Sequence, residues 1–213
     1  MASQISSGAA TPDPIRQELC DGLILAGGSG RRLGMGPKHA VRVRGRTMLA
    51  HTQRAIAPQV HRLWLNLPPA VVDEAAAPIP IHLADAEGFV GQGPLAGLLA
   101  GLTHCQNDFL LCVPIDAIRP PPDLAQRLLT SLQDQKADVA VAGGQYTCLL
   151  ARCAAEHGLT KTLRDYLHTG ARSVRGWLEQ QDNCRVDWPD DAGWIWSLNT
   201  PQELAAANQA MTR

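Results

Sequence analysis

The chain has 213 residues, 45% of them hydrophobic, and its formal net charge at pH 7 is −1. So small a net charge gives no support to a nucleic-acid or anionic-membrane partner, and no apolar run approaches the roughly 20 residues of a membrane span. Residues 1–14 also lack the charged start and apolar middle of a signal peptide. We therefore expect a cytoplasmic protein that acts on small molecules, without a nucleic-acid or membrane partner.

The composition also indicates how the chain is organised. Residues 1–20 are rich in small and polar residues and contain two prolines before any periodic pattern begins, so we expect a flexible tail there. Residues 21–213 suit a single domain with a substantial core. The six cysteines are scattered without a Cys-x-x-Cys pair, which favours reduced thiols over metal ligands or disulfides.

The most informative segment begins with Leu23–Ala26, a short apolar run typical of a buried strand. Glycines follow at positions 27, 28, 30, 34 and 36, together with Arg31, Arg32 and Lys38. Glycines allow backbone N–H groups to approach phosphate oxygens closely, and the three cations supply positive charge. Neither the Rossmann fingerprint nor the Walker A spacing is satisfied. The segment therefore predicts a phosphate-binding loop of another kind, and the alternative is a glycine-rich surface turn with incidental basic residues.

The rest of the chain alternates between strand-like and helix-like patterns. In chain order we expect extended Ala40–Val43, a helix capped by Thr47 to about Ala57, strands Val60–Leu67 and Ile79–Leu83, a helix opened by Gly91–Gly97 and running to about His104, strand Phe109–Ile115, helix Leu124–Gln135, strands Ala137–Ala142 and Thr147–Ala151, helical Ala154–Gln181 with breaks at Gly158 and Gly170, strand Trp194–Leu198, and a helix capped by Thr200 to about Met211. This alternation predicts a three-layer α/β/α, Rossmann-like fold with a mostly parallel central sheet.

Polar residues follow three of the predicted strands. Asn66 and Asp85 come after two short strands, and Asp116 follows Phe109–Ile115, the most apolar strand. Ligands of parallel sheets gather at the carboxyl ends of the strands, so these residues and the loop of Lys38 are expected to meet in one crevice. Asn66 and Asp85 suit the hydrogen-bonding edge of a base, although each could instead be a turn residue.

A carboxylate at the end of a buried strand is costly unless it is paired or bound to a metal ion. Mg²⁺ typically takes one or two carboxylates together with substrate phosphates, so Asp116 is the best candidate for a magnesium ligand. The alternative is that Asp116 only caps the end of its strand.

From about Asp21 to its C-terminus the chain resembles the molybdenum cofactor guanylyltransferase family. The resemblance rests on Leu25–Gly28 with Arg31, Arg32 and Lys38, on Asn66, Asp85, Gly93–Gly97, Pro114–Asp116 and Leu167–Val174, and on Asn199–Leu204. It implies a GT-A-like nucleotidyltransferase fold and the transfer of GMP from GTP to molybdopterin, with release of pyrophosphate. It also implies Mg²⁺ as cofactor, with other cofactor-biosynthesis proteins and recipient molybdoenzymes as possible partners.

The resemblance also implies roles for individual residues. It implies nucleotide binding by Leu25, Ala26, Gly27, Gly28, Lys38, Asn66, Asp85 and Asp116, with Asn66 and Asp85 on the guanosine and Asp116 on Mg²⁺. Arg32, Lys38 and Asp116 would form the catalytic set, because cations and the metal neutralise charge on the phosphates in the transition state.

Two alternatives to this activity follow from the same residues. Pro37 precedes the loop lysine where the family commonly has aspartate, and related cytidylyltransferases and sugar nucleotidyltransferases have proline there. A transferase that uses CTP, or a sugar phosphate as acceptor, is therefore one alternative. A catalytically quiet protein that only binds a nucleotide or the cofactor is the other.

Overall fold

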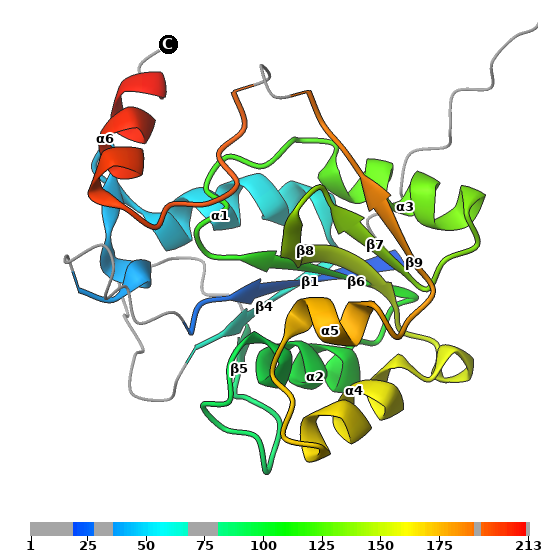
Figure 1. The fold of residues 1–213 in the computed structure, drawn as a ribbon. Helices are drawn as coiled ribbons and strands as arrows, with labels where there is room; N and C mark the ends of the chain where they lie inside the picture. The colour runs from blue at the N-terminus through cyan, green and yellow to red at the C-terminus, as the bar shows by residue number, and fades with distance from the viewer. Residues whose placement is uncertain (1–18, 28–35, 68–80, 190–192, 212–213) are drawn as a thin grey trace, which may run out of the picture.

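The computed structural model describes residues 19–27, 36–67, 81–189 and 193–211. Their central feature is a seven-stranded sheet with the order β5-β4-β1-β6-β8-β7-β9 (Figure 1). The strands are β1 (Cys20–Leu25), β4 (Arg62–Asn66), β5 (Ile81–Leu83), β6 (Phe109–Pro114), β7 (Val139–Ala142), β8 (Gln145–Arg152) and β9 (Asn183–Val186). Neighbouring strands run parallel except at β8, which is antiparallel to both β6 and β7. The predicted mostly parallel sheet is therefore confirmed.

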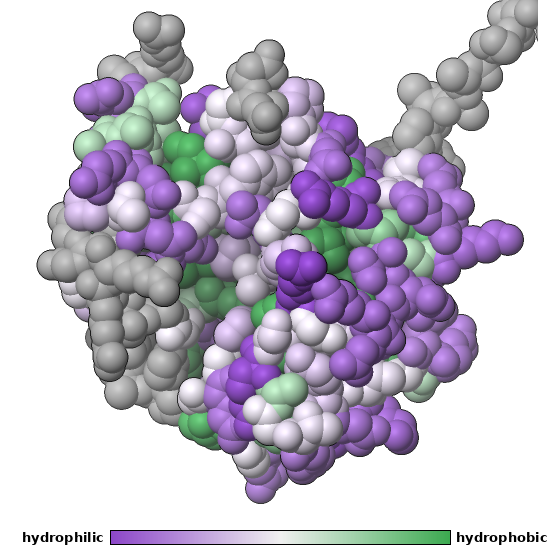
Figure 2. All heavy atoms as spheres, viewed as in Figure 1, coloured by the Kyte–Doolittle hydropathy of each residue, from purple (hydrophilic) through white to green (hydrophobic). Residues whose placement is uncertain are grey.

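Helices cover both faces of this sheet, which gives the predicted three layers (Figure 1). One face carries α2 (Pro94–His104), α4 (Leu159–His168) and α5 (Val174–Leu178), and the other carries α1 (Met48–Ile56) and α3 (Leu124–Asp134). The last helix, α6 (Pro201–Ala210), packs beside α1 because Leu204 and Ala207 share a buried cluster with Met48 and Leu49. Hydrophilic side chains cover most of the surface over α4 and α5 (Figure 2).

Two glycines of α2 allow this helix to approach the sheet closely. A Cβ atom at Gly97 would lie 2.3 Å from Oδ1 of Asn66, and one at Gly101 would lie 2.7 Å from Cδ2 of Leu23. Real Cβ atoms are not found at such distances, so any larger residue would force the helix or the strands to move. The small residues of α2 therefore set the distance between this helix and the ends of β1 and β4.

Several local predictions are confirmed. Thr47 caps α1 by accepting a hydrogen bond from the Ala50 N–H at 3.1 Å, and Thr200 forms a full capping box with Glu203 at the start of α6. All six cysteines are unpaired, and four of them are buried. In the described part of the chain, no helix has the length and apolarity needed to cross a membrane.

The predicted strand Trp194–Leu198 is wrong. In place of a strand there is a single bridge between Ile195 and Arg119, with hydrogen bonds of 3.2 and 3.0 Å in the two directions. The apolar residues of this segment serve side-chain packing instead. Trp196 meets Trp188 at a ring-centroid distance of 5.4 Å, and Leu198 is buried in the cluster that joins α1 and α6.

Other differences concern the ends of elements. The expected extended segment Ala40–Val43 divides into a short 3-10 helix, Lys38–Ala40, and strand β2 (Arg42–Val43), which forms a hairpin with β3 (Arg46–Thr47). Cys20, assigned to the tail from its sequence, is buried as the first residue of β1. Leu19, the other described residue of the expected tail, is exposed. Residues 1–18 lie outside the described residues, as do the first two residues of the expected strand Ile79–Leu83.

Candidate active site

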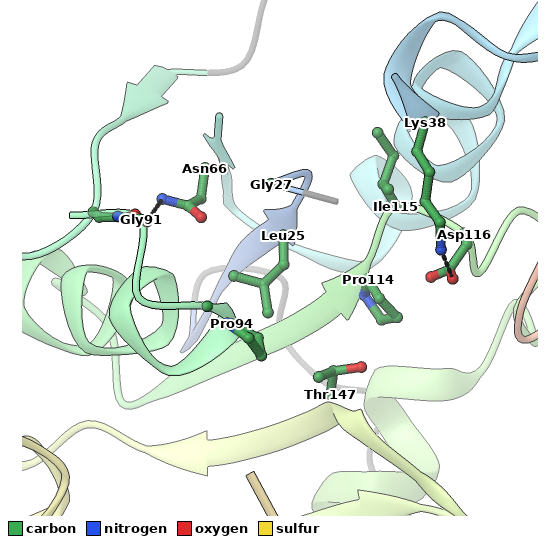
Figure 3. Close-up of a pocket in the computed structure, with 12 residues that line it drawn as sticks. Leu25, Gly27, Lys38, Asn66, Gly91, Pro94, Pro114, Ile115, Asp116 and Thr147 are labelled. Carbon is green, nitrogen blue, oxygen red and sulfur yellow. Dashed lines mark hydrogen bonds and ion pairs between the residues drawn. The ribbon is translucent and has the colours of Figure 1, made fainter. Parts of the chain in front are cut away.

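A cavity of about 340 Å³ lies at the carboxyl ends of β1, β4 and β6 (Figure 3). Ligand pockets typically measure roughly 300–1,000 Å³, so this cavity suits part of a nucleotide rather than a complete large ligand. Its lining comes from these strand ends, from the loop before α2 and from the beginning of β8. The lining residues are Leu25, Gly27, Lys38, Asn66, Asp85, Gly91, Gly93, Pro94, Pro114, Ile115, Asp116 and Thr147.

The cavity gathers every predicted site residue that the structure describes, with the exception of Ala26. Ala26 is buried, and its N–H donates to the Asn66 carbonyl at 2.9 Å, so it supports the wall behind the cavity. Leu25 contributes its side chain to the lining (Figure 3), while its carbonyl accepts from the Ile115 N–H at 3.0 Å. Gly28 and Arg32 lie outside the described residues.

One wall of the cavity is organised by Asn66 and Asp85. The Asn66 Nδ2 group donates to the Leu83 carbonyl at 3.1 Å and to Oδ1 of Asp85 at 3.0 Å. The second carboxylate oxygen of Asp85 accepts from the Gly91 N–H at 2.8 Å. Because Asn66 uses both amide hydrogens in this way, its side chain holds Asp85 in place, and the remaining lone pairs of Asp85 are the acceptors available to a ligand.

The other wall carries an ion pair between Lys38 and Asp116. Lys38 Nζ lies 2.6 Å from Oδ2 of Asp116, and the two side chains are only 16% and 13% exposed (Figure 3). The same ammonium donates to Oδ1 of Asn199 at 2.5 Å. Burial of a carboxylate at the end of β6 is thus offset by an opposite charge, as the cost of an unpaired buried charge requires.

The sequence contains a known domain over most of the described chain. A family model described as the MobA-like NTP transferase domain matches residues 22–184. The chain belongs to the MobA-like NTP transferase family. All the lining residues of the cavity fall within the matched segment, whereas Asn199 lies beyond it.

Relatives in this family share about a third of their residues with the chain. A protein named molybdenum cofactor guanylyltransferase from Bordetella petrii is 34% identical over 187 residues, which cover 86% of this chain and 94% of the relative. One of the same name from Shewanella frigidimarina is 32% identical over 184 residues, covering 86% of this chain and 92% of the relative. The resemblance noted in the sequence is therefore confirmed.

Solved structures show the same MobA-like architecture at low sequence identity. Molybdopterin-guanine dinucleotide biosynthesis protein A from Archaeoglobus fulgidus is 18% identical, with a TM-score of 0.73 over 90% of this chain and 98% of that one. The 2-C-methyl-D-erythritol 4-phosphate cytidylyltransferase from Thermus thermophilus is 15% identical, with a TM-score of 0.68 and the same coverages. These similarities establish the nucleotidyltransferase fold.

The loop before α2 of the MobA-like domain needs glycine at two positions. Gly91 has φ of 73°, and Gly93 has φ of 91° with ψ of −170°, a combination that is essentially restricted to glycine. Pro94 then begins α2. The first N–H groups of a helix have no acceptor within the helix, so the N–H that proline lacks costs no hydrogen bond. The loop thereby brings the Gly91 N–H to Asp85 and directs the positive end of the α2 dipole toward the cavity.

Several residues in or beside the cavity were not predicted as site residues, and two of them, Thr147 and Asn199, have polar side chains. Thr147 lies near the beginning of β8, and it reaches the cavity because β8 is antiparallel to β6, with Leu149 opposite Cys112. The rule that ligands lie at carboxyl ends of parallel strands does not find such a position. Asn199 stood in the C-terminal motif of the resemblance, and its place directly before a capped helix was the signal that could have drawn attention to it.

The residues of the cavity fit a single magnesium ion. Asp116 lines the cavity and offers hard oxygen donors, and Mg²⁺ commonly uses one or two carboxylates plus phosphates and water. Among the described residues, no group of three or more His, Cys, Asp or Glu side chains is placed to hold a metal ion, so they do not build an all-protein metal cage there.

Proposed function

We propose that this MobA-like transferase moves GMP from GTP to molybdopterin with release of pyrophosphate. The observation that carries the proposal is the arrangement of two polar pairs, Asn66–Asp85 and Lys38–Asp116, on opposite walls of one cavity at the strand ends. This arrangement occurs in a chain that shares about a third of its residues with proteins named molybdenum cofactor guanylyltransferase. The first pair suits a base and the second suits phosphates.

In the proposed reaction, a phosphate oxygen of molybdopterin attacks the α-phosphorus of GTP. A new P–O bond forms there while the bond from the α-phosphorus to the oxygen of the β-phosphate breaks, and pyrophosphate leaves with that oxygen. The attacking phosphate monoester is already largely ionised at neutral pH, because its second pKa is about 6. Therefore no side chain is needed to remove a proton from the nucleophile.

The residues then act through position and charge. Lys38 places an ammonium against the phosphates, where it stabilises the negative charge that develops on their oxygens. Asp116 would hold Mg²⁺, which supplies further neutralisation of phosphate charge when bound. Leu25, Ala26, Gly27 and Gly28 would shape the phosphate loop, with Arg32 as a further cation.

Base recognition is assigned to the opposite wall. Asp85 is held by Asn66 and by the Gly91 N–H, so its free lone pairs face a ligand with little freedom to turn away. Guanine presents a ring N–H and an exocyclic amino group on one edge, and a carboxylate accepts from both. A fixed acceptor of this kind favours guanine through hydrogen bonds that a base without these donors leaves unmade.

The experiment that tests the proposal follows product by mass. The chain is incubated with GTP, Mg²⁺ and molybdenum cofactor, and we expect molybdopterin guanine dinucleotide together with one pyrophosphate per product. A Lys38→Ala variant should lose most of this activity, whereas Lys161→Ala should keep it, because Lys161 is an exposed residue of α4 paired with Asp165. Absence of the dinucleotide with the wild-type chain would overturn the proposal.

A cytidylyl transfer is the second candidate, and Pro37 is the observation that favours it. Pro37 has extended geometry, with φ of −66° and ψ of 139°, and leads directly into the turn that carries Lys38. Thermal protection by GTP, CTP and UTP distinguishes the two. Protection by GTP supports guanylyl transfer, whereas protection by CTP without any by GTP would replace it.

A further inference from the structure

Asn199 is joined to the site lysine from a distant part of the chain. Its Oδ1 accepts a hydrogen bond from Lys38 Nζ at 2.5 Å, across a sequence separation of 161 residues. It lies outside the segment matched by the family model, and it is not among the residues that line the cavity. Within the described part of the chain, Asn199 thus reaches the cavity through its hydrogen bond to Lys38, which is the position of a supporting residue.

The backbone of Asn199 is fixed by the start of α6. Its N–H donates to Oε2 of Glu203 at 2.6 Å, and the Thr200 N–H donates to the same oxygen at 3.0 Å. In return, the Glu203 N–H donates to the Thr200 hydroxyl at 3.2 Å, which completes the capping box. The hydrogen bond from the Asn199 backbone, followed by that from Thr200, holds the pKa of Glu203 below its usual value.

The side chain of Asn199 is oriented as well. Its Nδ2 group donates to the hydroxyl of Ser197, so the amide oxygen is turned toward Lys38. The helix behind it is anchored to the same body as Asp116, because Leu204 and Ala207 share a buried cluster with Ile115. Lys38, Asp116 and Asn199 are therefore held in one frame, although they come from three separate segments.

The chemistry of the two Lys38 acceptors differs in a way that matters for phosphate binding. Asp116 is a carboxylate and compensates the ammonium charge, whereas Asn199 is neutral. A neutral acceptor fixes the direction of the ammonium without reducing its charge. A side chain as long as lysine has much rotamer freedom to lose, so a second anchor lowers the entropy cost of meeting a phosphate.

We propose that Asn199, held by the capping box of α6, is a positioning residue that keeps the Lys38 ammonium at the cavity for an anionic nucleotide. The proposal rests on the proposed function only for the identity of that nucleotide. The wall that carries Lys38 and Asp116 is called here the phosphate wall. The proposal adds to it Asn199, from the C-terminal segment beyond the matched domain.

The first test measures the accessibility of Lys38 directly. The chain contains only three lysines, Lys38, Lys136 and Lys161. Brief acetylation of the folded protein with an N-hydroxysuccinimide ester, read by peptide mass spectrometry, therefore reports each amine separately. We expect Asn199→Ala to raise the acetylation rate of Lys38 severalfold and to leave Lys136 and Lys161 unchanged. An unchanged rate at Lys38 would overturn the proposal.

The matched control is Asn208→Ala, in α6, the helix that follows Asn199. Asn208 accepts from the Arg44 N–H at 2.8 Å and donates to the Leu204 carbonyl at 2.9 Å, so its loss also removes hydrogen bonds of an asparagine. We expect the rate at Lys38 to remain at the wild-type value. An equal rise in this variant would attribute the effect to general loosening of α6 and would overturn the specific role of Asn199.

The second test separates position from charge with Asn199→Asp. The carboxylate keeps an acceptor for Lys38, so acetylation of Lys38 should stay low, but the added negative charge should weaken binding of a non-hydrolysable GTP analogue about tenfold or more. Titration calorimetry measures this affinity. Wild-type affinity in this variant would contradict the argument that the second acceptor must be neutral.

Steady-state kinetics with the complete reaction distinguish positioning from substrate contact. Asn199→Ala should raise KM for GTP about tenfold, as for loss of a hydrogen bond to a charged group, and leave KM for the acceptor unchanged. A rise in the acceptor KM alone would make Asn199 an acceptor contact and would overturn the proposal.

If Asn199→Ala does not fold, Thr200→Ala keeps the inference testable, since a weakened cap should raise Lys38 acetylation to a smaller extent.

Failure of the proposed function would be recognised separately. The acetylation and analogue-binding measurements need no acceptor and no turnover. A wild-type chain that forms no dinucleotide would therefore overturn the proposed function, while protection of Lys38 by Asn199 would still support the positioning role.

Discussion

The two halves of the sheet contribute to the cavity in different ways. On the side of β5, β4, β1 and β6 the strands are parallel, and their carboxyl ends carry Leu25, Asn66 and Asp116. On the other side the antiparallel β8 presents its beginning, so Thr147 reaches the same edge from the opposite chain direction. The direction of a strand therefore decides whether the residues that follow it or those that open it face the ligand.

The two walls of the cavity differ in how their polar groups are held. In the parallel half, Asn66 and Asp85 are fixed by neighbours within the same half, including the Gly91 N–H. Lys38 of the Lys38–Asp116 pair also donates to Asn199, which lies in the C-terminal segment, beyond the last strand of the sheet. The wall of Asn66 and Asp85 is thus held by segments close to it in the chain, whereas the wall of Lys38 and Asp116 is also joined to the C-terminal segment.

The largest expected effect comes from Asp116→Ala, which tests the phosphate wall. Loss of the carboxylate removes the expected magnesium ligand and the charged partner of Lys38, so kcat/KM for GTP should fall about 100-fold to 1,000-fold. Pyrophosphate release under saturating Mg²⁺ measures the change. Asp165→Ala, an exposed carboxylate of α4, is the control and should leave the rate unchanged.

Undiminished pyrophosphate release by Asp116→Ala would refute the assignment of Asp116. The two walls of the cavity would then differ less than we infer, because the carboxylate at the end of β6 would have only a structural role. Circular dichroism of the variant distinguishes a loss of chemistry from a loss of fold. Replacement of one partner of a nearly buried ion pair is itself destabilising.

The next prediction concerns the parallel half and compares two glycines of α2, Gly97 and Gly101. Gly97→Ala would place a Cβ atom 2.3 Å from Asn66 Oδ1 and 2.7 Å from Leu25 Cδ2. Gly101→Ala would make similar contacts at 2.7 Å with Leu23 and 2.9 Å with Leu110, one turn farther from the cavity. We expect both to lower the free energy of unfolding by about 1–3 kcal/mol, the usual cost of overpacking.

Nucleotide binding should separate these two variants. Displacement of Asn66 also displaces Asp85, so Gly97→Ala should weaken GTP binding about tenfold or more, whereas Gly101→Ala should bind as the wild type does. Urea unfolding and calorimetry provide the two measurements. Gly144→Ala is the control for the substitution itself, since no atom lies within 4 Å of a Cβ there. Equal affinity losses at Gly97 and Gly101 would show that the site depends on the whole helix and not on Asn66.

The same difference between the halves explains what could be predicted from the sequence. Apolar runs followed by Asn66, Asp85 and Asp116 identified the strand ends, because in parallel strands the rule for ligand position needs no further information. Hydrophobic periodicity carries no strand direction, so the role of Thr147 could not be derived from it.

Periodicity also does not distinguish a strand from a loop that packs its apolar residues. Trp194–Leu198 alternates like a strand, but Leu198 is buried and Ile195 half-buried in the cluster shared with α6 and Ile115. Ile195 forms the one backbone bridge of this described segment. The partner of Asn199 is 161 residues away, and no local pattern encodes such a contact. The cap formed by Thr200 and Glu203 was predictable because all of its atoms lie within one turn.

Buried thiols in the two halves offer the smallest effect and the last comparison. Burial raises the pKa of Cys20 on β1 to about 12 and also raises the pKa of Cys112 on β6 and of Cys148 on β8. The ordinary pKa of these thiols is 9.0. Above pH 9.0 the folded chain therefore keeps them protonated, whereas the unfolded chain releases their protons. The free energy of unfolding keeps its full value below pH 9.0 and decreases above it, because the unfolded state then binds fewer protons than the folded state.

At pH 9.5 each such thiol should lower the free energy of unfolding by less than about 1 kcal/mol, since one pH unit corresponds to about 1.4 kcal/mol per proton at most. Urea unfolding at pH 8.0 and 9.5 gives this difference. The serine variants Cys112→Ser and Cys148→Ser have no thiol to titrate at the substituted position. If both halves stay folded as one unit up to the transition, each variant should reduce the pH dependence by the same amount. A reduction with Cys112→Ser alone would mean that the half containing β8 opens, and exposes its thiol, before the parallel half unfolds.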